Sequence, residues 1–179
     1  MDQVVLDVVA KICQGPVLIE LGYETPETAL KILSEGDVSV ETSEDVAATM
    51  LDVIGKVDEF VTDENAQVTL TIPEITYDMV KRMYSAGLDG TTYMGVGHSA
   101  GTQKTSVCTT MRIRPWALRN EVSPTRCIEF WKVAVSGNKS IRMGKEAPHG
   151  FVSVVFQVFK DTSQTDGMML FKITSPTRS

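Results

Sequence analysis

Apolar and polar residues in the second half of the chain follow the two-residue period of β-strands. This pattern predicts four strands, at residues 107–116, 128–135, 151–159 and 168–173. The segment 151–159 is apolar on both faces, as expected for a central strand that is covered on both sides. Turns are expected at Ser136-Gly137-Asn138 and at residues 161–167, and strands joined by short turns pair antiparallel.

The first half contains shorter strand signals and one clear helix signal. Strands are expected at residues 17–21, 38–41 and 68–72. A helix is expected over residues 75–84, because Thr76 can cap its first turn and Gly87 can end it. The apolar stripe of this helix, which would face the core, consists of Ile75, Met79, Val80 and Met83.

Two segments of the first half fit either a helix or a strand. Residues 25–36 have the start and stop chemistry of a helix, with Pro26 near the beginning and Gly36 at the end. Residues 43–54 carry apolar side chains at helical spacing and are followed by Gly55. Local propensity does not decide between helix and strand in either segment.

Length and composition describe an ordinary globular protein with one domain, residues 1–179. The chain is 42% hydrophobic and 22% charged, and 179 residues are enough to bury a core. No apolar run is long enough for a transmembrane helix, and Met1-Asp2-Gln3 lacks the basic residues that begin a secretory signal. We therefore expect the chain to fold in the cytoplasm of the cell that makes it, without membrane contact.

Charge is distributed unevenly between the two halves. Residues 1–90 carry eighteen acidic and five basic side chains, a net charge of −13, whereas residues 91–179 carry five acidic and twelve basic ones, a net charge of +7. The basic residues are scattered and are not interleaved with aromatics, which argues against a nucleic-acid-binding surface. Either the two halves neutralise each other within one fold, or the acidic part of one subunit meets the basic part of the next.

One pentapeptide matches a catalytic motif. Gly97-His98-Ser99-Ala100-Gly101 fits the Gly-x-Ser-x-Gly nucleophile elbow, in which a strand enters and a helix leaves. Here residues 102–106 are expected to open a strand instead. A catalytic triad would need His149 together with Glu129 or Glu146. Because the chain lacks the repeated βα units of hydrolases, we expect no enzymatic activity and assign no catalytic residue.

Cofactor and metal motifs are equally weak. Gly95, Gly97 and Ala100 fit a dinucleotide-binding fingerprint, but the helix that should follow is missing from the pattern. The two histidines and three cysteines share no ligand spacing, and Cys13, Cys108 and Cys127 are expected to be reduced, packed thiols. No cofactor or metal is therefore expected. Adjacent acidic pairs, which would point to opposite faces of a strand, are expected to form a solvated surface rather than a catalytic dyad: Glu44-Asp45, Asp58-Glu59 and Asp63-Glu64.

The order of elements between Gly36 and Met83 resembles that of bacteriophage tail tube proteins (major tail proteins). In that family a strand bearing Val-Asp is followed by a Val-Thr-x-Thr strand, an acidic residue and a helix. The corresponding segments here are residues 38–41, 55–62, 67–74 and 75–84. The later strands are similar in order to the family's second sheet, so the resemblance covers residues 15–175.

The resemblance implies a mainly-β fold: an antiparallel β-sandwich or barrel with one flanking α-helix and a long loop. Residues 1–14 would form an N-terminal arm. It also implies hexameric rings that stack into a hollow tube in the virion tail, with each subunit giving strands to a continuous inner barrel. Expected partners are further copies of the chain and the sheath, tape measure and tail terminator proteins, while DNA would pass without specific binding.

Two sets of site residues follow from the resemblance. Acidic side chains would line the lumen, and Glu41, Asp58 and Glu59 are the candidates, with at most one of the last two pointing inward. The long Gly-rich loop at residues 87–106 would contact the neighbouring ring, and its candidates are Gly90, Tyr93, Gly97 and Lys104. The alternatives are another virion protein such as a head–tail connector, a small serine esterase using Ser99, and a monomeric β-sandwich binding module.

Overall fold

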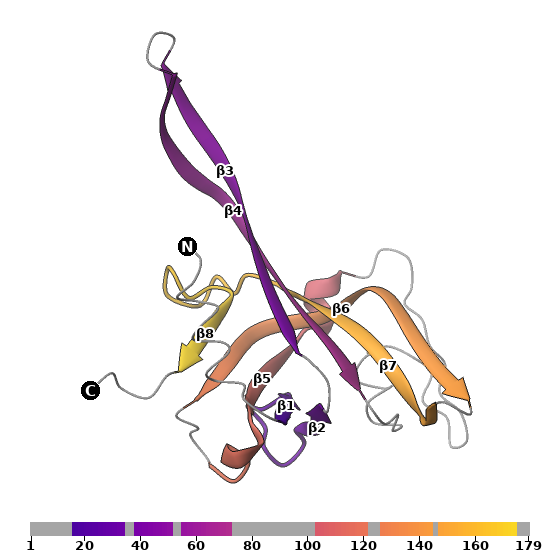
Figure 1. Cartoon of the computed structure of the whole chain (residues 1–179). Helices are drawn as coiled ribbons and strands as arrows, with labels where there is room; N and C mark the ends of the chain where they lie inside the picture. Colours follow the sequence, from indigo (N-terminus) through magenta and orange to yellow (C-terminus); the bar gives the residue numbers. More distant parts are fainter. Residues whose placement is uncertain are drawn as a thin grey trace.

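The protein is mainly β, as the sequence predicts, and its strands form one antiparallel sheet (Figure 1). A computed structural model describes residues 16–34, 38–51, 55–72, 103–121, 126–144 and 147–174. Its strands are β1 (Val17–Leu21), β2 (Leu30–Ser34), β3 (Ser39–Leu51), β4 (Gly55–Ile72), β5 (Thr109–Pro115), β6 (Cys127–Gly144), β7 (Ala147–Val158) and β8 (Phe171–Thr174). Two short 3-10 helices are η1 (Lys104–Val107) and η2 (Trp116–Leu118).

The sheet is strongly curved but is not a closed barrel. Its order is β2-β1-β5-β6-β7-β4-β3, and β8 adds to β6 beside the start of that long strand. The terminal strands β2 and β3 are not hydrogen-bonded to each other in the described residues, which corrects the expectation of a barrel within one subunit. The helix expected at residues 75–84 lies outside the described residues, and so do most of the loop at 87–106 and the arm at 1–14.

One core fills the concave side of the curved sheet. Alternate residues of the strands enter it, and Ile19, Val68 and Phe130 are fully buried there. The ring of Phe130 packs against Phe171 with the centroids 5.4 Å apart, so the short strand β8 is held by side-chain packing as well as by pairing. Strand β7 lies between β6 and β4, which confirms the central position predicted for residues 151–159. The expected cover on both faces is wrong, because Val154 and Phe156 are buried in the core whereas Ser153 on the other face is exposed.

Two segments that local propensity left open are extended. Residues 22–28 form turns, beginning with Gly22 at a φ of 72°, and β2 follows them; residues 43–51 continue β3. In both cases a long-range partner strand provides the hydrogen bonds, β1 for β2 and β4 for β3. The turn expected at Ser136-Gly137-Asn138 is wrong, because β6 continues through it. The pairing with β7 shifts register between Ser136 and Ser140 instead, and a glycine in a strand often marks such a bulge.

The face of the sheet opposite the core carries a ladder of alternating charges. Five residues on five neighbouring strands are opposite one another in register: Lys31, Glu20, Arg112, Glu129 and Lys172. Glu129 accepts from Arg112 at 2.7 Å and from Lys172 at 2.8 Å. These cations lower the pKa of Glu129 although its burial opposes the shift. Tyr23 covers the guanidinium of Arg112 at 4.2 Å from the ring centroid.

The loop between β7 and β8 is organised by one carboxylate. Asp161 accepts hydrogen bonds from Lys132 at 2.8 Å, from the backbone and hydroxyl of Ser163, and from Gln164. These donors, Lys132 first, hold the pKa of Asp161 far below its usual range. The loop therefore depends on an ionised carboxylate.

Replacing Asp161 by asparagine should destabilise the protein by about 1–2 kcal/mol at pH 7, the usual contribution of hydrogen bonds to a charged group. A carboxyl group with a lowered pKa contributes stability above its unfolded-state pKa of about 3.9, and this contribution is lost as the pH falls toward the folded-state value. The difference between wild type and Asp161→Asn in urea unfolding should thus be constant above about pH 5 and shrink below about pH 4. Asp166→Asn, at an exposed position of the same loop, is the control. A difference that did not change with pH would contradict this role.

Candidate functional site

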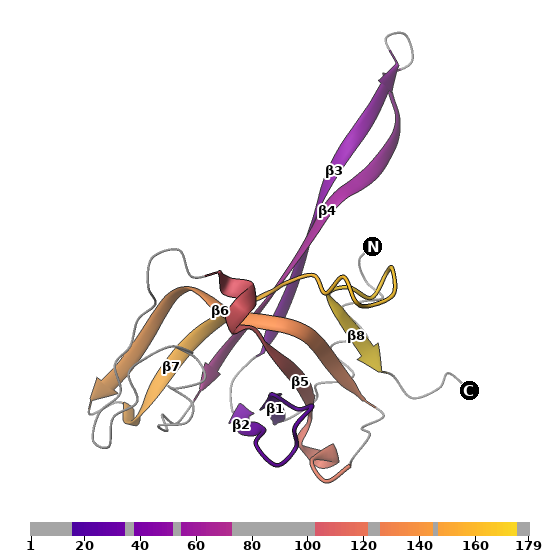
Figure 2. The same cartoon turned by 180° about the vertical axis from the view of Figure 1, so that it is seen from behind.

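The most distinctive feature of the molecule is a long two-stranded hairpin that projects from the body (Figures 1 and 2). Strands β3 and β4 pair with each other from Ser39–Thr69 to the tip at Leu51–Gly55. Strand β4 pairs with β7 only over residues 66–72. At about 3.3 Å per residue, residues 55–65 extend roughly 35 Å beyond that pairing.

The free part of this hairpin has little to stabilise it within one subunit. None of the described core residues lies between residues 44 and 64. An isolated two-stranded hairpin is only marginally stable in water, and both of its outer edges present unpaired backbone N–H and C=O groups. These properties are typical of a segment that is completed by a partner.

The hairpin is acidic, and two of its acidic pairs face each other. Strand β3 carries three acidic residues and β4 four, against the single base Lys56. Glu44 is directly opposite Glu64, and the next pair is Asp45 opposite Asp63. Like charges directly across an antiparallel pair are destabilising. Their presence therefore has no explanation in the stability of the isolated subunit.

The same hairpin exposes an apolar pair. Val46 is opposite Val61, next to a register shift in the pairing, and the two side chains are 51% and 49% exposed. Sequence spacing does not reveal this pair, because Val46 belongs to an apolar pattern that also fits a helix. The pairing across the hairpin is what brings the two valines together.

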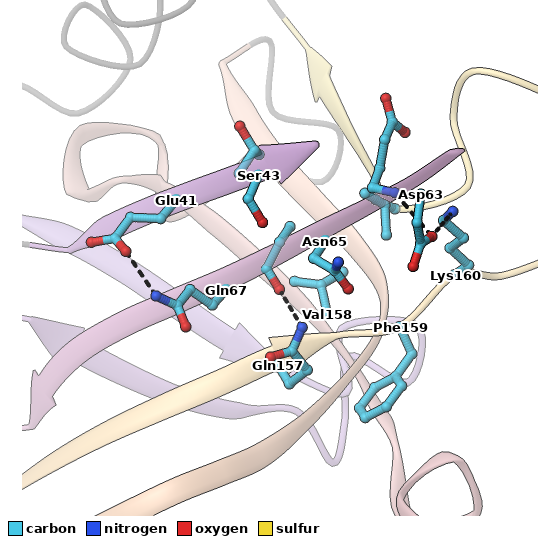
Figure 3. A pocket seen from close by; sticks show the side chains of 13 residues that line it. Glu41, Ser43, Asp63, Asn65, Gln67, Gln157, Val158, Phe159 and Lys160 are labelled. Atoms are coloured by element: carbon cyan, nitrogen blue, oxygen red, sulfur yellow. Dashed lines mark hydrogen bonds and ion pairs between the residues drawn. The ribbon is translucent and has the colours of Figure 1, made fainter. Parts of the chain in front are cut away.

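A polar groove of about 660 Å³ lies where the hairpin leaves the body (Figure 3). The Glu41 carboxylate accepts from Gln67 at 2.7 Å, and Gln157 donates to the carbonyl of Ala66 at 3.1 Å. Lys160 pairs with Asp63, which lowers the pKa of that carboxyl group. These contacts fix the direction in which the hairpin leaves the body.

The lumen candidates lie on this hairpin. Glu41 is exposed on β3 near the base, and Asp58 and Glu59 are opposite Thr49 and Ala48 in the outer part. Their orientation toward a lumen remains a prediction.

Of the loop candidates, only Lys104 lies in the described residues; Gly90, Tyr93 and Gly97 do not. Lys104 begins η1, where a strand opening had been expected, and its ammonium donates to the carbonyl of Val135 at 3.2 Å. A contact of Lys104 with another ring remains a prediction.

Arg112 and Arg114 already have carboxylate partners within the subunit, so they are not available to the acidic hairpin of a neighbouring copy. Arg112 belongs to the charge ladder, and Arg114 is 3% exposed and donates to Glu20 at 2.6 Å. Arg119 is exposed on the turn after β5.

The residues of the catalytic alternative lie mostly outside the described part of the chain, as does the side chain of His149, so this alternative stays a prediction. Ser99 and Glu146 lie outside it, and Glu129 is held by Arg112 and Lys172. Burial raises the pKa values of the Cys108 and Cys127 thiols, as expected for packed, unreactive cysteines, and Cys13 lies outside the described residues. Among the described residues, no group of histidine, cysteine and acidic side chains has the geometry of a metal site.

Comparison with known proteins gives no family assignment: no family model matches the chain, and no curated protein matches it significantly. In the described segments, no helix has the length and apolar character needed to cross a membrane.

Proposed function

We propose that this chain is a structural subunit that assembles with copies of itself through the β3–β4 hairpin, as the subunit of a phage tail tube. The observation that carries the proposal is the projecting hairpin, whose backbone edges have no strand partner among the described residues beyond the body. In a ring of copies, these edges would pair with strands of the neighbouring subunits, and no exposed edge would remain. The element order shared with tail tube proteins supports this particular assembly.

The acidity of the hairpin supports a channel for DNA. A wall of carboxylates offers phosphates no cation to pair with, so DNA would slide without binding, whereas a basic wall would hold it. In this proposal Glu41 and one of Asp58 and Glu59 face the lumen of stacked, hexameric rings. The sheath, tape measure and terminator proteins of a virion tail would be further partners.

Sedimentation of the purified chain at several protein and salt concentrations tests the proposal. The mass should rise with protein concentration, and micrographs of concentrated samples should show rings and tubes. The salt dependence should reveal a charged interface, because salt screens exposed charges. A strict monomer under all conditions would contradict the proposal. So would ester hydrolysis that disappears in Ser99→Ala, since it would indicate an enzyme.

A further inference from the structure

One face of the hairpin combines two features that are unfavourable in an isolated subunit. Glu44 and Val46 are two positions apart on β3, so their side chains lie on the same face, about 7 Å apart along the strand. Their partners across the hairpin are Glu64 and Val61. We call these four residues the acidic–apolar face. It presents two facing carboxylates beside two half-exposed valines.

The acidic–apolar face is not neutralised by the described side chains of the subunit. In the described segments no Lys, Arg or His nitrogen lies within 4 Å of the carboxylates of Glu44 or Glu64. Among the described side chains, Lys160 reaches this region, and it pairs with Asp63 at the next register position. A complementary surface would therefore need both a cation and an apolar group.

A cation and an apolar group occur together at the end of the body farthest from the hairpin tip, where η2 follows β5 (Figures 1 and 2). The guanidinium of Arg119 lies over the ring of Trp116, 4.8 Å from its centroid. Trp116 is 39% exposed, one of the largest exposed apolar side chains of the described residues. No carboxylate pairs with Arg119 in the part of the chain that the structure describes.

The turn that carries this pair is rigidly held. The amide of Trp116 donates to the carbonyl of Pro16 at 2.9 Å. The buried guanidinium of Arg114 donates to the carbonyls of Leu118, Arg119 and Glu121. The stacked pair is thus presented in one orientation, which lowers the entropy lost when a partner binds.

We propose that the Trp116–Arg119 turn of one copy docks on the acidic–apolar face of the next copy, with Arg119 between Glu44 and Glu64 and Trp116 against the two valines. A guanidinium can donate to two carboxylates at once, and its stacking on tryptophan matches the neighbouring apolar pair. The two surfaces differ, so the contact is head-to-tail, and its repetition closes a ring or extends a stack of subunits. This inference rests on the proposed self-assembly and names the surfaces that meet.

Charge exchange tests the contact. Arg119→Glu should raise the dissociation constant of self-association by about tenfold or more, since it places a third carboxylate against the acidic–apolar face. Glu44→Lys/Glu64→Lys should weaken association similarly. Combining the three substitutions should restore association to within about threefold of wild type. Arg126→Glu is the matched control, because it makes the same charge change at an exposed position without a stacked tryptophan.

Sedimentation at fixed salt measures each dissociation constant, and thermal unfolding checks that each exposed substitution leaves the fold intact. If Arg119→Glu associates like wild type, or the triple variant is no better than Arg119→Glu alone, the contact is refuted while assembly through the hairpin stands. If the wild-type chain does not associate at all, both the contact and the proposed function fail.

Discussion

Replacing Glu20 by alanine should lower the free energy of unfolding by about 3–5 kcal/mol, the cost of removing one partner of a buried ion pair. The Glu20 side chain is 5% exposed, and one of its oxygens accepts from Arg114 at 2.6 Å. Its other oxygen lies 3.8 Å from a guanidinium nitrogen of Arg112. Alanine would leave the buried charge of Arg114 without its carboxylate. It would also remove one member of the charge ladder, between Lys31 and Arg112.

Urea unfolding at pH 7 measures this loss, at a protein concentration low enough to keep the chain monomeric. Glu27→Ala, in the exposed turn between β1 and β2, is the matched control and should change stability by less than about 0.5 kcal/mol. Glu20→Leu combined with Arg114→Met should recover part of the loss, because no buried charge then remains unpaired. A loss below about 1 kcal/mol for Glu20→Ala would show that water reaches Arg114 and replaces the carboxylate.

The sequence predicted the β class and the places of most strands, because those strands follow the two-residue period closely. Residues 17–21, for example, form β1 within the same bounds. The segment 43–54 was ambiguous because its apolar residues are spaced as in an amphipathic helix. Pairing with β4, which begins only at Gly55, decides its conformation. Local spacing contains no information about that partner.

The candidate site, like the fold, could be predicted from the sequence only in part. The acidity of residues 35–64 was evident from the sequence, and the structure places most of those acids on one hairpin. Strand register across a bulge places Glu44 opposite Glu64 and Val46 opposite Val61. Sequence spacing does not reveal that register. The charge ladder likewise joins residues from five strands that are far apart in the chain. The motif around Ser99 lies outside the described residues, so its interpretation stays a prediction.

Removing the free part of the hairpin should abolish self-association while leaving the body folded. We expect this of a variant in which residues 44–64 are replaced by Asn-Gly, so that Ser43 and Asn65, already opposite each other, flank a two-residue turn. The deletion spares the pairing of β4 with β7 at residues 66–72 and removes no described core residue. It does remove the ion pair of Asp63 with Lys160, which is exposed to solvent and should contribute little to stability.

Circular dichroism and thermal unfolding should therefore show a β-rich monomer with nearly wild-type stability, and sedimentation should show no growth of mass with concentration. The matched control keeps the hairpin and removes only that ion pair, through Asp63→Asn. This control should change the stability of the monomer little, because the lost pair is exposed and the like-charge opposition of Asp63 to Asp45 is relieved as well. The backbone edges of its hairpin remain able to pair, so its mass should still grow with concentration. A truncated chain that still formed rings would show that the edges of β3 and β4 are not the assembly surface. A truncated chain that failed to fold would show instead that the hairpin stabilises the body, although none of its described side chains between residues 44 and 64 belongs to the core.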